Sequence, residues 1–497
     1  MSFWRHALAL VAALSSLTPA FGADPQTLRV GSKRFTESYI LAHVLAQTAE
    51  PHAHAEVLEG LGNTAIVYEA LRSGRIDLYP EYLGTIDLEI LKNPAPTSLE
   101  AVNRQLAPLG LGAAIPLGFN DGYALAMREA DAQRLGIKSL SDLARHGELK
   151  LGLSNEFIGR SDGWPGLVQR YGFKARPIGL DHGLAYDALA KAQVDVIDIY
   201  TTDAKIGQLG LRVLDDDKHY FPRYDAVVLY RLDVPQRFPA AWRALQGLAG
   251  RIDEAAMIAM NARAELQGQP FAQIARERLS GARSTGAQRG FVDKLLGADL
   301  GRLTAQHFGL VLASVVLAAL IGIPLAIAVA SRAVWRAWVL GATGLLQTVP
   351  SLALLAVLIS WLGAIGTLPA LIALTLYALL PIVRNTCTGL AEVPGGLKLA
   401  AMALGLSRRD QLLRIELPLA LPTIIAGVRI AAVISVGTAT IAAFIGAGGF
   451  GERIVTGLAL NDNQLMLAGA LPSAALALAI EGAFEVLEWR LGKRKPA

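Results

Sequence analysis

The sequence of 497 residues contains a single cysteine, Cys387. No disulfide can form within the chain, so any exported part of it must be stabilised by its core alone. Charged residues are also scarce, at 18% of the chain against 53% hydrophobic residues. This composition is too apolar for an ordinary soluble protein and too charged for a chain that lies in a membrane throughout.

The shortage of charge is confined to the C-terminal part of the chain. Between His307 and Arg384 the only charged side chains are Arg332 and Arg336, whereas charge is spread along the whole sequence before Arg302. The composition therefore changes near residue 300. The net charge of +4 does not indicate nucleic-acid binding, because many basic residues flank apolar runs, where membrane topology explains them.

The sequence also lacks the motifs of several enzyme classes. No G-x-x-x-x-G-K-[ST] motif is present, and the glycine-rich stretch Gly446 to Gly451 is not preceded by a strand, so we expect a tight extracellular turn there. No Ser/His/Asp arrangement, metal-ligand cluster or catalytic carboxylate pair emerges. We therefore expect no catalytic residue, metal or bound cofactor in this chain, and any use of ATP and Mg²⁺ belongs to a partner subunit.

The first residues have the pattern of a secretory signal. Arg5 and His6 precede an apolar run, and small residues around Ala20 to Ala23 suit cleavage by a signal peptidase. We predict a signal peptide over residues 1–23, with an uncleaved anchor as the alternative. Either form places the following domain outside the cytoplasm.

Residues 24–285 are predicted to form an α/β domain of two lobes. Strand-like runs such as Leu149 to Leu153 and Val194 to Ile199 alternate with helical patterns such as Thr64 to Ser73, which favours a largely parallel sheet. The length exceeds what one small lobe needs, and two lobes with a cleft between them are the natural division. A linker is predicted over residues 286–302.

Residues 303–490 are predicted to form an all-α membrane domain. Five apolar runs are each close to the roughly 20 residues that cross a bilayer. They are Phe308 to Ala330, Val339 to Leu362, Ile365 to Val383, Thr423 to Ile445, and Leu465 to Phe484. Basic clusters follow the first, third and fifth runs, the last in a tail over residues 491–497, and such clusters stay on the cytoplasmic side. An exported N-terminal half and a cytoplasmic C-terminus need an odd number of spans, which agrees with this count.

The basic loop at residues 399–418 separates the third and fourth runs. Its sequence allows a short helix, a turn at Gly405 and a second helix stopped by Pro418. This pattern resembles the coupling loop of ABC-type importer permeases, which seats in a groove of a cytoplasmic ATPase subunit. The resemblance rests on Ala400, Ala401, Gly405, Ile415, Leu417 and Pro418, and the family usually has a glutamate where this chain has Leu399.

Four stretches of the predicted α/β domain stand out. They are GSKRFTESYI from Gly31, YPEYLGT from Tyr79, LSNEFIGRSDGWPGL from Leu153, and VDVIDIYTTD from Val194 with YFPRYDAVVLY from Tyr220. Together they resemble the substrate-binding proteins of quaternary-amine importers, which carry glycine betaine, choline or proline betaine. The family often has Asn-Thr-Tyr where this chain has Asp121-Gly122-Tyr123.

The resemblance implies a cage of four tyrosines around a quaternary ammonium group, formed by Tyr82, Tyr123, Tyr200 and Tyr224, with Asp121 beside it. It also implies that the carboxylate of a zwitterionic ligand meets Lys33, Thr85 and Arg160. The chemistry is consistent, because a trimethylammonium group has no N–H to donate and the negative faces of aromatic rings can surround it.

We therefore predict a fused substrate-binding and permease subunit of an ATP-driven importer for quaternary-ammonium osmoprotectants. The expected partners are a small quaternary-ammonium ligand, a cytoplasmic ABC ATPase subunit and a second copy of the chain. The expected location is a bacterial inner membrane, crossed several times, with the binding domain periplasmic or extracellular. Two alternatives stay open: import of ergothioneine or another betaine-like nutrient, and a membrane-bound ligand sensor.

Overall fold

The computed structural model describes residues 27–281, 290–460 and 462–492. The chain divides into two units, Met1–Gln288 and Arg289–Ala497, which are described separately. The predicted signal peptide (1–23), the start of the predicted linker (286–289) and the end of the predicted tail (493–497) lie outside the described residues.

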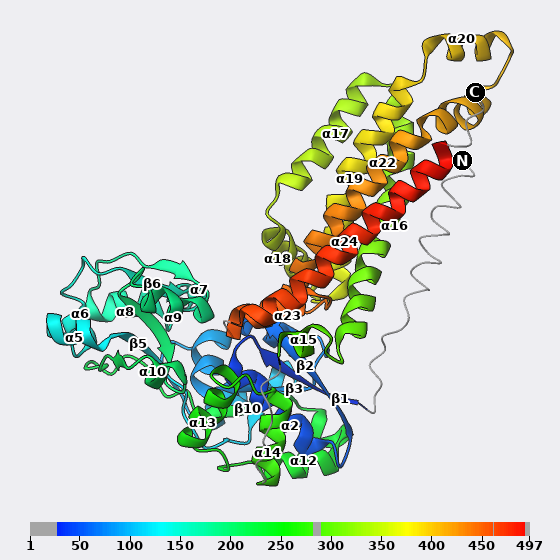
Figure 1. Ribbon diagram of the computed structural model, residues 1–497. Coiled ribbons are helices and arrows are strands. Elements are labelled where there is room, and N and C mark those ends of the chain that lie inside the picture. The colour runs from blue at the N-terminus through cyan, green and yellow to red at the C-terminus, as the bar shows by residue number, and fades with distance from the viewer. Residues whose placement is uncertain (1–26, 282–289, 461, 493–497) are drawn as a thin grey trace. The chain divides into compact units, whose positions relative to one another are not determined.

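Unit 1 contains two five-stranded sheets, one in each lobe (Figure 1). The first sheet has the order β2 (His54–Gly62), β1 (Thr27–Lys33), β3 (Leu78–Tyr82), β10 (Ala226–Arg231) and β4 (Leu111–Ala114). The second has the order β7 (Ile178–Leu180), β6 (Leu151–Ser154), β8 (Val196–Tyr200), β5 (Tyr123–Arg128) and β9 (Leu211–Val213). The prediction of a two-lobed α/β fold is confirmed.

Each sheet is largely parallel, as predicted, and contains one reversed strand. Strand β10 runs antiparallel to both of its neighbours, β3 and β4. Strand β5 likewise runs antiparallel to β8 and β9. Each of these two strands follows a segment that crosses from the other lobe. Its direction depends on this crossing, which local sequence patterns do not encode.

The two chain segments that cross between the lobes lie side by side. Asn120 and Asp225 form a bridge between them, and the Asp121 N–H donates to the Tyr224 carbonyl oxygen at 3.1 Å. The Asn120 side chain also accepts from the Tyr224 N–H at 2.7 Å. The residues just before β5 and β10, next to the predicted cage residues Tyr123 and Tyr224, therefore lie where the chain crosses between the lobes.

The core of the first lobe forms around helix α2 (Thr36–Ala49). Eleven of its side chains are buried, among them Tyr39, Ile40 and Leu45. This helix packs against β1 and β2 on one side and α14 (Phe271–Ser280) on another. Because α2 follows directly after β1, burial of its apolar residues also fixes the Lys33-to-Thr36 turn that reaches the cleft.

Unit 2 is helical, with α19 (Thr367–Glu392) at its centre, packed against α16 (Leu300–Ala330) and α22 (Leu417–Ala439). Within the described residues, four helices are long and apolar enough to cross a membrane: Leu300–Ala330, Thr367–Glu392, Arg408–Ile445 and Asn463–Arg490. They correspond to four of the five predicted spans. The predicted bundle of apolar spans is confirmed, with four or five spans by length and composition.

The second predicted span is not one straight helix. It is split into α17 (Ala333–Thr348) and α18 (Ser351–Leu362), which are bent by 98° where Pro350 interrupts the chain. Proline lacks the N–H that would continue the hydrogen-bond ladder, so a break at this position has a direct cause. The count of five spans holds only if this bent pair crosses the membrane as one.

The described part of the predicted linker is helical and attached to unit 2. Helix α15 (Phe291–Leu295) is tied to the start of α24 (Asn463–Gly492) by an ion pair between Lys294 and Asp462 at 2.5 Å. Arg453, which is 4% exposed, pairs with Asp299 at 2.6 Å and donates to the Leu295 carbonyl at 2.9 Å. These contacts hold the entry to α16.

Arg429 in α22 is half-buried and faces two carboxylates of α24. Its Nη1 lies 3.6 Å from Glu481 Oε1 and 3.4 Å from Glu488 Oε2. The arrangement is a charge pairing between helices, which lowers the cost of placing charged groups on an apolar span.

Candidate ligand-binding site

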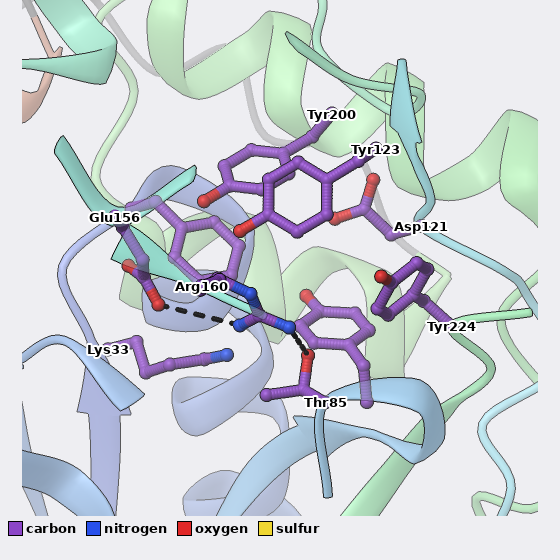
Figure 2. A pocket seen from close by; sticks show the side chains of 10 residues that line it. Lys33, Thr85, Asp121, Tyr123, Glu156, Arg160, Tyr200 and Tyr224 are labelled. Atoms are coloured by element: carbon purple, nitrogen blue, oxygen red, sulfur yellow. Dashed lines mark hydrogen bonds and ion pairs between the residues drawn. The ribbon is translucent and has the colours of Figure 1, made fainter. Parts of the chain in front are cut away.

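One pocket in unit 1 is lined by residues of both lobes (Figure 2). All eight residues predicted to contact a ligand line it: Lys33, Tyr82, Thr85, Asp121, Tyr123, Arg160, Tyr200 and Tyr224. Phe35 and Glu156 complete the lining. The residues come from six segments of the sequence, and the fold brings them to one place.

The pocket residues stand at the ends of strands. Lys33 ends β1, Tyr82 ends β3, Tyr200 ends β8 and Tyr123 begins β5. The antiparallel register of β5 and β8 places Tyr123 directly opposite Tyr200. The backbone at the end of a strand is held by the sheet, so the side chains of these residues are kept in defined positions.

The aromatic rings form a continuous wall. The Tyr123 and Tyr200 ring centroids are 5.2 Å apart, and the Tyr123 and Tyr224 centroids are 5.7 Å apart with the rings nearly perpendicular. Phe35 lies 5.2 Å from Tyr200 and 6.2 Å from Tyr82. Ring faces at these separations surround a space suited to an ammonium group without N–H donors.

Lys33 is already paired with a carboxylate of the chain. Its Nζ lies 2.6 Å from Glu81 Oε1, and both side chains are buried. The same Nζ is 5.0 Å from the centroid of the Tyr82 ring and 5.5 Å from that of Phe35. The rings therefore attract a cation of the protein itself at this side of the pocket.

Arg160 is also partnered, and its partners span both lobes. Its Nε and Nη2 donate to the two oxygens of Asp162 at 2.8 and 2.6 Å, and Nη2 donates to Thr85 Oγ1 at 3.2 Å. Glu156 lies 3.6 Å from Nη1 and accepts from Thr64 Oγ1 at 2.9 Å. The three residues predicted to meet a ligand carboxylate thus lie on one side of the pocket (Figure 2).

The helix that carries Glu156 and Arg160 is fixed by Ser154. Helix α7 (Asn155–Gly159) is capped by the Ser154 hydroxyl, which accepts from the Phe157 N–H at 3.2 Å. The same hydroxyl donates to Asp198 Oδ2 at 2.6 Å. Asp198 is fully buried, so the cap is held rigidly and the pocket side chains with it.

A second layer of polar groups lies behind the rings at Asp121. The Thr202 hydroxyl is 2.6 Å from Glu37 Oε2 and 3.0 Å from Asp121 Oδ1. The Tyr82 hydroxyl donates to Glu37 Oε1 at 2.5 Å. Burial raises the pKa of the Glu37 carboxyl, and burial together with the Glu37 and Asp203 charges raises the pKa of the Asp121 carboxyl strongly.

Tyr200 is supported from behind by His182 and Asp203. The imidazole of His182 lies 4.5 Å from the Tyr200 ring centroid, and its Nε2 is 3.1 Å from Asp203 Oδ2. The Tyr200 N–H donates to the same oxygen at 2.9 Å. Although burial opposes the charged form, the Asp203 charge and hydrogen bond raise the pKa of His182 to about 9.

The sequence predictions missed Phe35 and Glu156 in the lining and Glu37 behind it. Each lies inside a stretch that the sequence singled out, so the signal was present in the motifs themselves. Thr202, which also contacts Glu37, lies inside the stretch from Val194, whereas Asn261, a further contact of Glu37, lies outside all four stretches. Their role depends on tertiary contacts that the sequence alone does not give.

The predicted coupling loop forms the hydrogen-bonded helix α20 (Gly395–Ala403), a turn and α21 (Arg408–Gln411). Gly405 has a positive φ of 73° in the turn. Ala401 is buried, Ile415 and Leu417 are half-buried, and Ala400, Gly405 and Pro418 are exposed. Leu399, at the position where the family usually has glutamate, is 64% exposed.

The prediction that Pro418 stops a helix is wrong. The chain stays helical from Arg408 to Ile445, and Pro418 lies in the first turn of α22. The preceding π-helical turn (Leu412–Glu416) widens the backbone just before the proline. This π-helical turn accommodates the N–H that the proline lacks, so the helix continues through it.

A two-lobed α/β unit with an aromatic pocket, joined to a helical unit with apolar spans, defines a transport protein that combines a binding domain and a membrane domain. Residues 26–280 match the family described as the substrate binding domain of ABC-type glycine betaine transport systems, and the chain belongs to it. Residues 318–493 match the binding-protein-dependent transport system inner membrane component. The predicted fusion of a binding domain with a permease is confirmed.

Several curated proteins resemble one part of the chain or the other. The glycine-betaine-binding protein of Pseudomonas aeruginosa is 37% identical over 291 residues, 54% of this chain and 92% of its own length. The osmoprotectant import permease protein of Salmonella typhimurium is 44% identical over 197 residues, 39% of this chain and 88% of its own length.

A third relative is the ergothioneine transport permease/ergothioneine binding protein of Helicobacter pylori. It is 32% identical over 268 residues, which is 52% of this chain and 48% of that protein. The alignment therefore spans about half the length of this relative.

Proposed function

We propose that unit 1 binds a small quaternary-ammonium compound in the pocket between its lobes. The observation that carries the proposal is the wall of ring faces from Phe35, Tyr82, Tyr123, Tyr200 and Tyr224 around one space, with the Asp121 carboxyl among them. A cation without N–H donors gains about 0.5–2 kcal/mol from each ring face that it contacts after desolvation. Hydrogen bonds alone cannot select such a ligand.

Both chemical subclasses of the ligand have support in the pocket. Choline-like cations need only the rings and the nearby carboxylates. Betaines also need a donor for their carboxylate, which Arg160 and Thr85 supply. Because Arg160 is shared with Asp162, a betaine carboxylate competes with a carboxylate of the chain for the same guanidinium group.

The transport cycle that we propose involves three further components. Ligand closes the lobes, the loaded domain delivers it to a permease formed by two copies of unit 2, and a separate cytoplasmic ABC ATPase subunit uses ATP and Mg²⁺ to switch access. The exposed α20 helix is the surface that this subunit contacts. The chain lies in a bacterial inner membrane, with the binding domain on the outer side. The match to an inner membrane transport component favours this cycle over a ligand sensor.

Import of ergothioneine is the second candidate, favoured by the Helicobacter pylori relative. Ergothioneine shares the trimethylammonium group and carboxylate of the betaines and adds an imidazole-derived ring. The same cage would hold its cationic end, so the two candidates differ only in what fills the rest of the pocket.

Calorimetric titration of the full chain in detergent with choline, glycine betaine, carnitine and ergothioneine tests the proposal. At least one of the four should bind with a dissociation constant in the micromolar range or below, and tetramethylammonium should compete with it. If none of the four binds to folded protein, the proposed function is wrong. Tightest binding of ergothioneine would select the second candidate.

A further inference from the structure

We propose that Asp121 is a proton-switched counter-charge for the ligand: it is a neutral carboxylic acid in the ligand-free protein and releases its proton to solvent when a quaternary-ammonium cation enters the pocket. This inference rests on the proposed function and adds to it a residue that determines specificity for a full positive charge.

The Thr202 hydroxyl lies between two carboxyl groups, 2.6 Å from Glu37 Oε2 and 3.0 Å from Asp121 Oδ1. A hydroxyl carries a single proton and can donate only one hydrogen bond. If both carboxyls were ionised, one of these two contacts would join oxygen lone pairs without a proton between them. With all three groups nearly inaccessible to solvent, at 2%, 4% and 1% exposure for Glu37, Asp121 and Thr202, one of the carboxyls must be protonated.

The donors around each carboxyl decide which one holds the proton. Glu37 receives hydrogen bonds from the Tyr82 hydroxyl at 2.5 Å, the Thr202 hydroxyl at 2.6 Å and the Asn261 amide at 3.3 Å. Apart from the shared hydroxyl, the described residues offer Asp121 the Thr202 N–H alone, at 3.3 Å. Glu37 thus has two donors besides the shared hydroxyl, which also lies nearer to it, and Asp121 has one long contact, so the ionised form is better stabilised at Glu37. Asp121 is therefore the protonated acid, and its O–H donates a hydrogen bond to Thr202 Oγ1.

The other charged groups near Asp121 favour the same assignment. Glu37 on α2 and Asp203 after β8 are the carboxylates that face it, and both raise its pKa in addition to the effect of burial. The Tyr82 hydroxyl is engaged by Glu37 and supplies no charge. The two cations that line the pocket, Lys33 and Arg160, are each paired with another carboxylate, Glu81 and Asp162.

Entry of a cation reverses the balance at Asp121. Asp121 lines the pocket beside Tyr123 and Tyr224, so a trimethylammonium group enclosed by the rings lies close to it (Figure 2). A positive charge within a few ångströms favours the ionised form and lowers the pKa of a buried carboxyl. The Asp121 O–H bond breaks, its electrons stay on the carboxylate, and the proton is released to solvent water. The Thr202 hydroxyl keeps its own proton, donated to Glu37.

Proton release can be counted on the full chain in detergent. Titration with choline at pH 7 in phosphate and in Tris, which have different ionisation enthalpies, should give observed enthalpies that differ by the release of about one proton per choline bound. Below the ligand-free pKa of Asp121, choline affinity should rise with pH by up to about tenfold per pH unit, because the cation binds to the ionised form.

Asp121→Asn is the informative variant, since an amide mimics the neutral acid and can still donate to Thr202. It should release no proton and bind choline about tenfold more weakly, while binding of the uncharged isostere 3,3-dimethyl-1-butanol changes by less than about twofold. Glu129→Gln is the control. Glu129 lies outside the pocket and pairs with Arg212, so this variant should release the same number of protons as the parent.

An infrared difference spectrum of the parent protein provides a test that needs no variant. Addition of choline should remove a carbonyl band of a protonated carboxylic acid, and labelling of aspartate with ¹³C should shift that band. Choline binding without proton release overturns the inference and leaves the proposed function intact, and so does proton release that persists in Asp121→Asn. If choline, glycine betaine, carnitine and ergothioneine all fail to bind to the parent, the proposed function falls and this inference with it.

Discussion

The guanidinium carbon of Arg160 lies 5.3 Å from the centroid of the Tyr123 ring. The same guanidinium is held by two bonds to Asp162, which also accepts from the Tyr224 hydroxyl at 2.8 Å. Tyr123 and Tyr224 are thus both linked to a group that we propose holds a ligand carboxylate. We therefore expect the selectivity between betaines and choline to depend on how Asp162 and a ligand share Arg160.

Substitutions of Arg160 and of Asp162 should change the selectivity between glycine betaine and choline in opposite directions. Arg160→Ala should weaken glycine betaine by about tenfold or more relative to choline, because choline has no carboxylate for Arg160 to hold. Asp162→Asn should raise the affinity for glycine betaine relative to choline, since it frees the guanidinium and keeps an acceptor for Tyr224. Titration calorimetry of both ligands on each variant measures the ratio. Equal losses for the two ligands in Arg160→Ala would contradict the predicted carboxylate contact.

Two substitutions of Tyr200 separate the contribution of its ring face to choline affinity from that of its hydroxyl. Tyr200→Phe keeps the face and should change choline affinity by less than about threefold, whereas Tyr200→Ala removes it and should cost about 1–2 kcal/mol, roughly tenfold or more. Affinities are compared on variants whose thermal unfolding shows that they fold, because Tyr200 also packs on Phe35, Tyr123 and His182. Parent-like affinity in a folded Tyr200→Ala variant would remove Tyr200 from the cage.

The turn at Gly405 supports a prediction about coupling. Its φ of 73° lies in the left-handed region, but a Cβ there would meet no atom within 4 Å, so any penalty comes from the backbone alone. Gly405→Val should reduce transport and ligand-stimulated ATPase activity by about tenfold, whereas Gly405→Asn should keep most of both, because asparagine tolerates this conformation. Ligand binding should stay unchanged in each. Equal transport by the two variants would show that the turn conformation does not matter for coupling.

The sequence predicted which residues share a pocket better than it predicted the details of the fold around them. Lys33, Tyr82 and Arg160 each lie in a motif that contains a further lining residue, so these motifs identified residues that meet in one pocket. The antiparallel return of β5 and β10 was missed, because pairing direction depends on how the chain crosses between lobes. The 98° bend at Pro350 and the helix that continues through Pro418 show that a proline's effect depends on its place in the helix.

The charge partners of the pocket were likewise out of reach of the sequence. Lys33 was predicted to meet the carboxylate of a ligand. Whether Glu81 neutralises it depends on the register of β1 and β3, which places these two side chains next to each other. The Thr202 hydroxyl reaches Glu37 across 165 residues of chain. Contacts between residues so far apart in the sequence depend on how the lobes pack, and local residue spacing does not predict them.

His182 should make the stability around Tyr200 depend on pH. Because its folded pKa is raised to about 9, above the ordinary value of 6.5, its contribution is fully present below about pH 6.5 and is lost as pH rises through 9. At pH 6 His182→Gln should lower the free energy of opening of β8 by about 1–3 kcal/mol relative to the parent, and the difference should nearly vanish by pH 10. Hydrogen exchange at β8 amides, compared between parent and variant at each pH, measures it. A difference that is the same at both pH values would contradict the charged His182–Asp203 pair.

The central claim is that the pocket selects a positive charge by its aromatic faces. Competition calorimetry on the full chain with choline and its uncharged isostere 3,3-dimethyl-1-butanol tests it most directly, since the two have the same shape and differ in the charge of one central atom. We predict that choline binds at least about tenfold more tightly, and that this ratio shrinks in Tyr200→Ala. Equal affinity for the two compounds would show that the pocket recognises an apolar shape and would contradict the proposed cation cage.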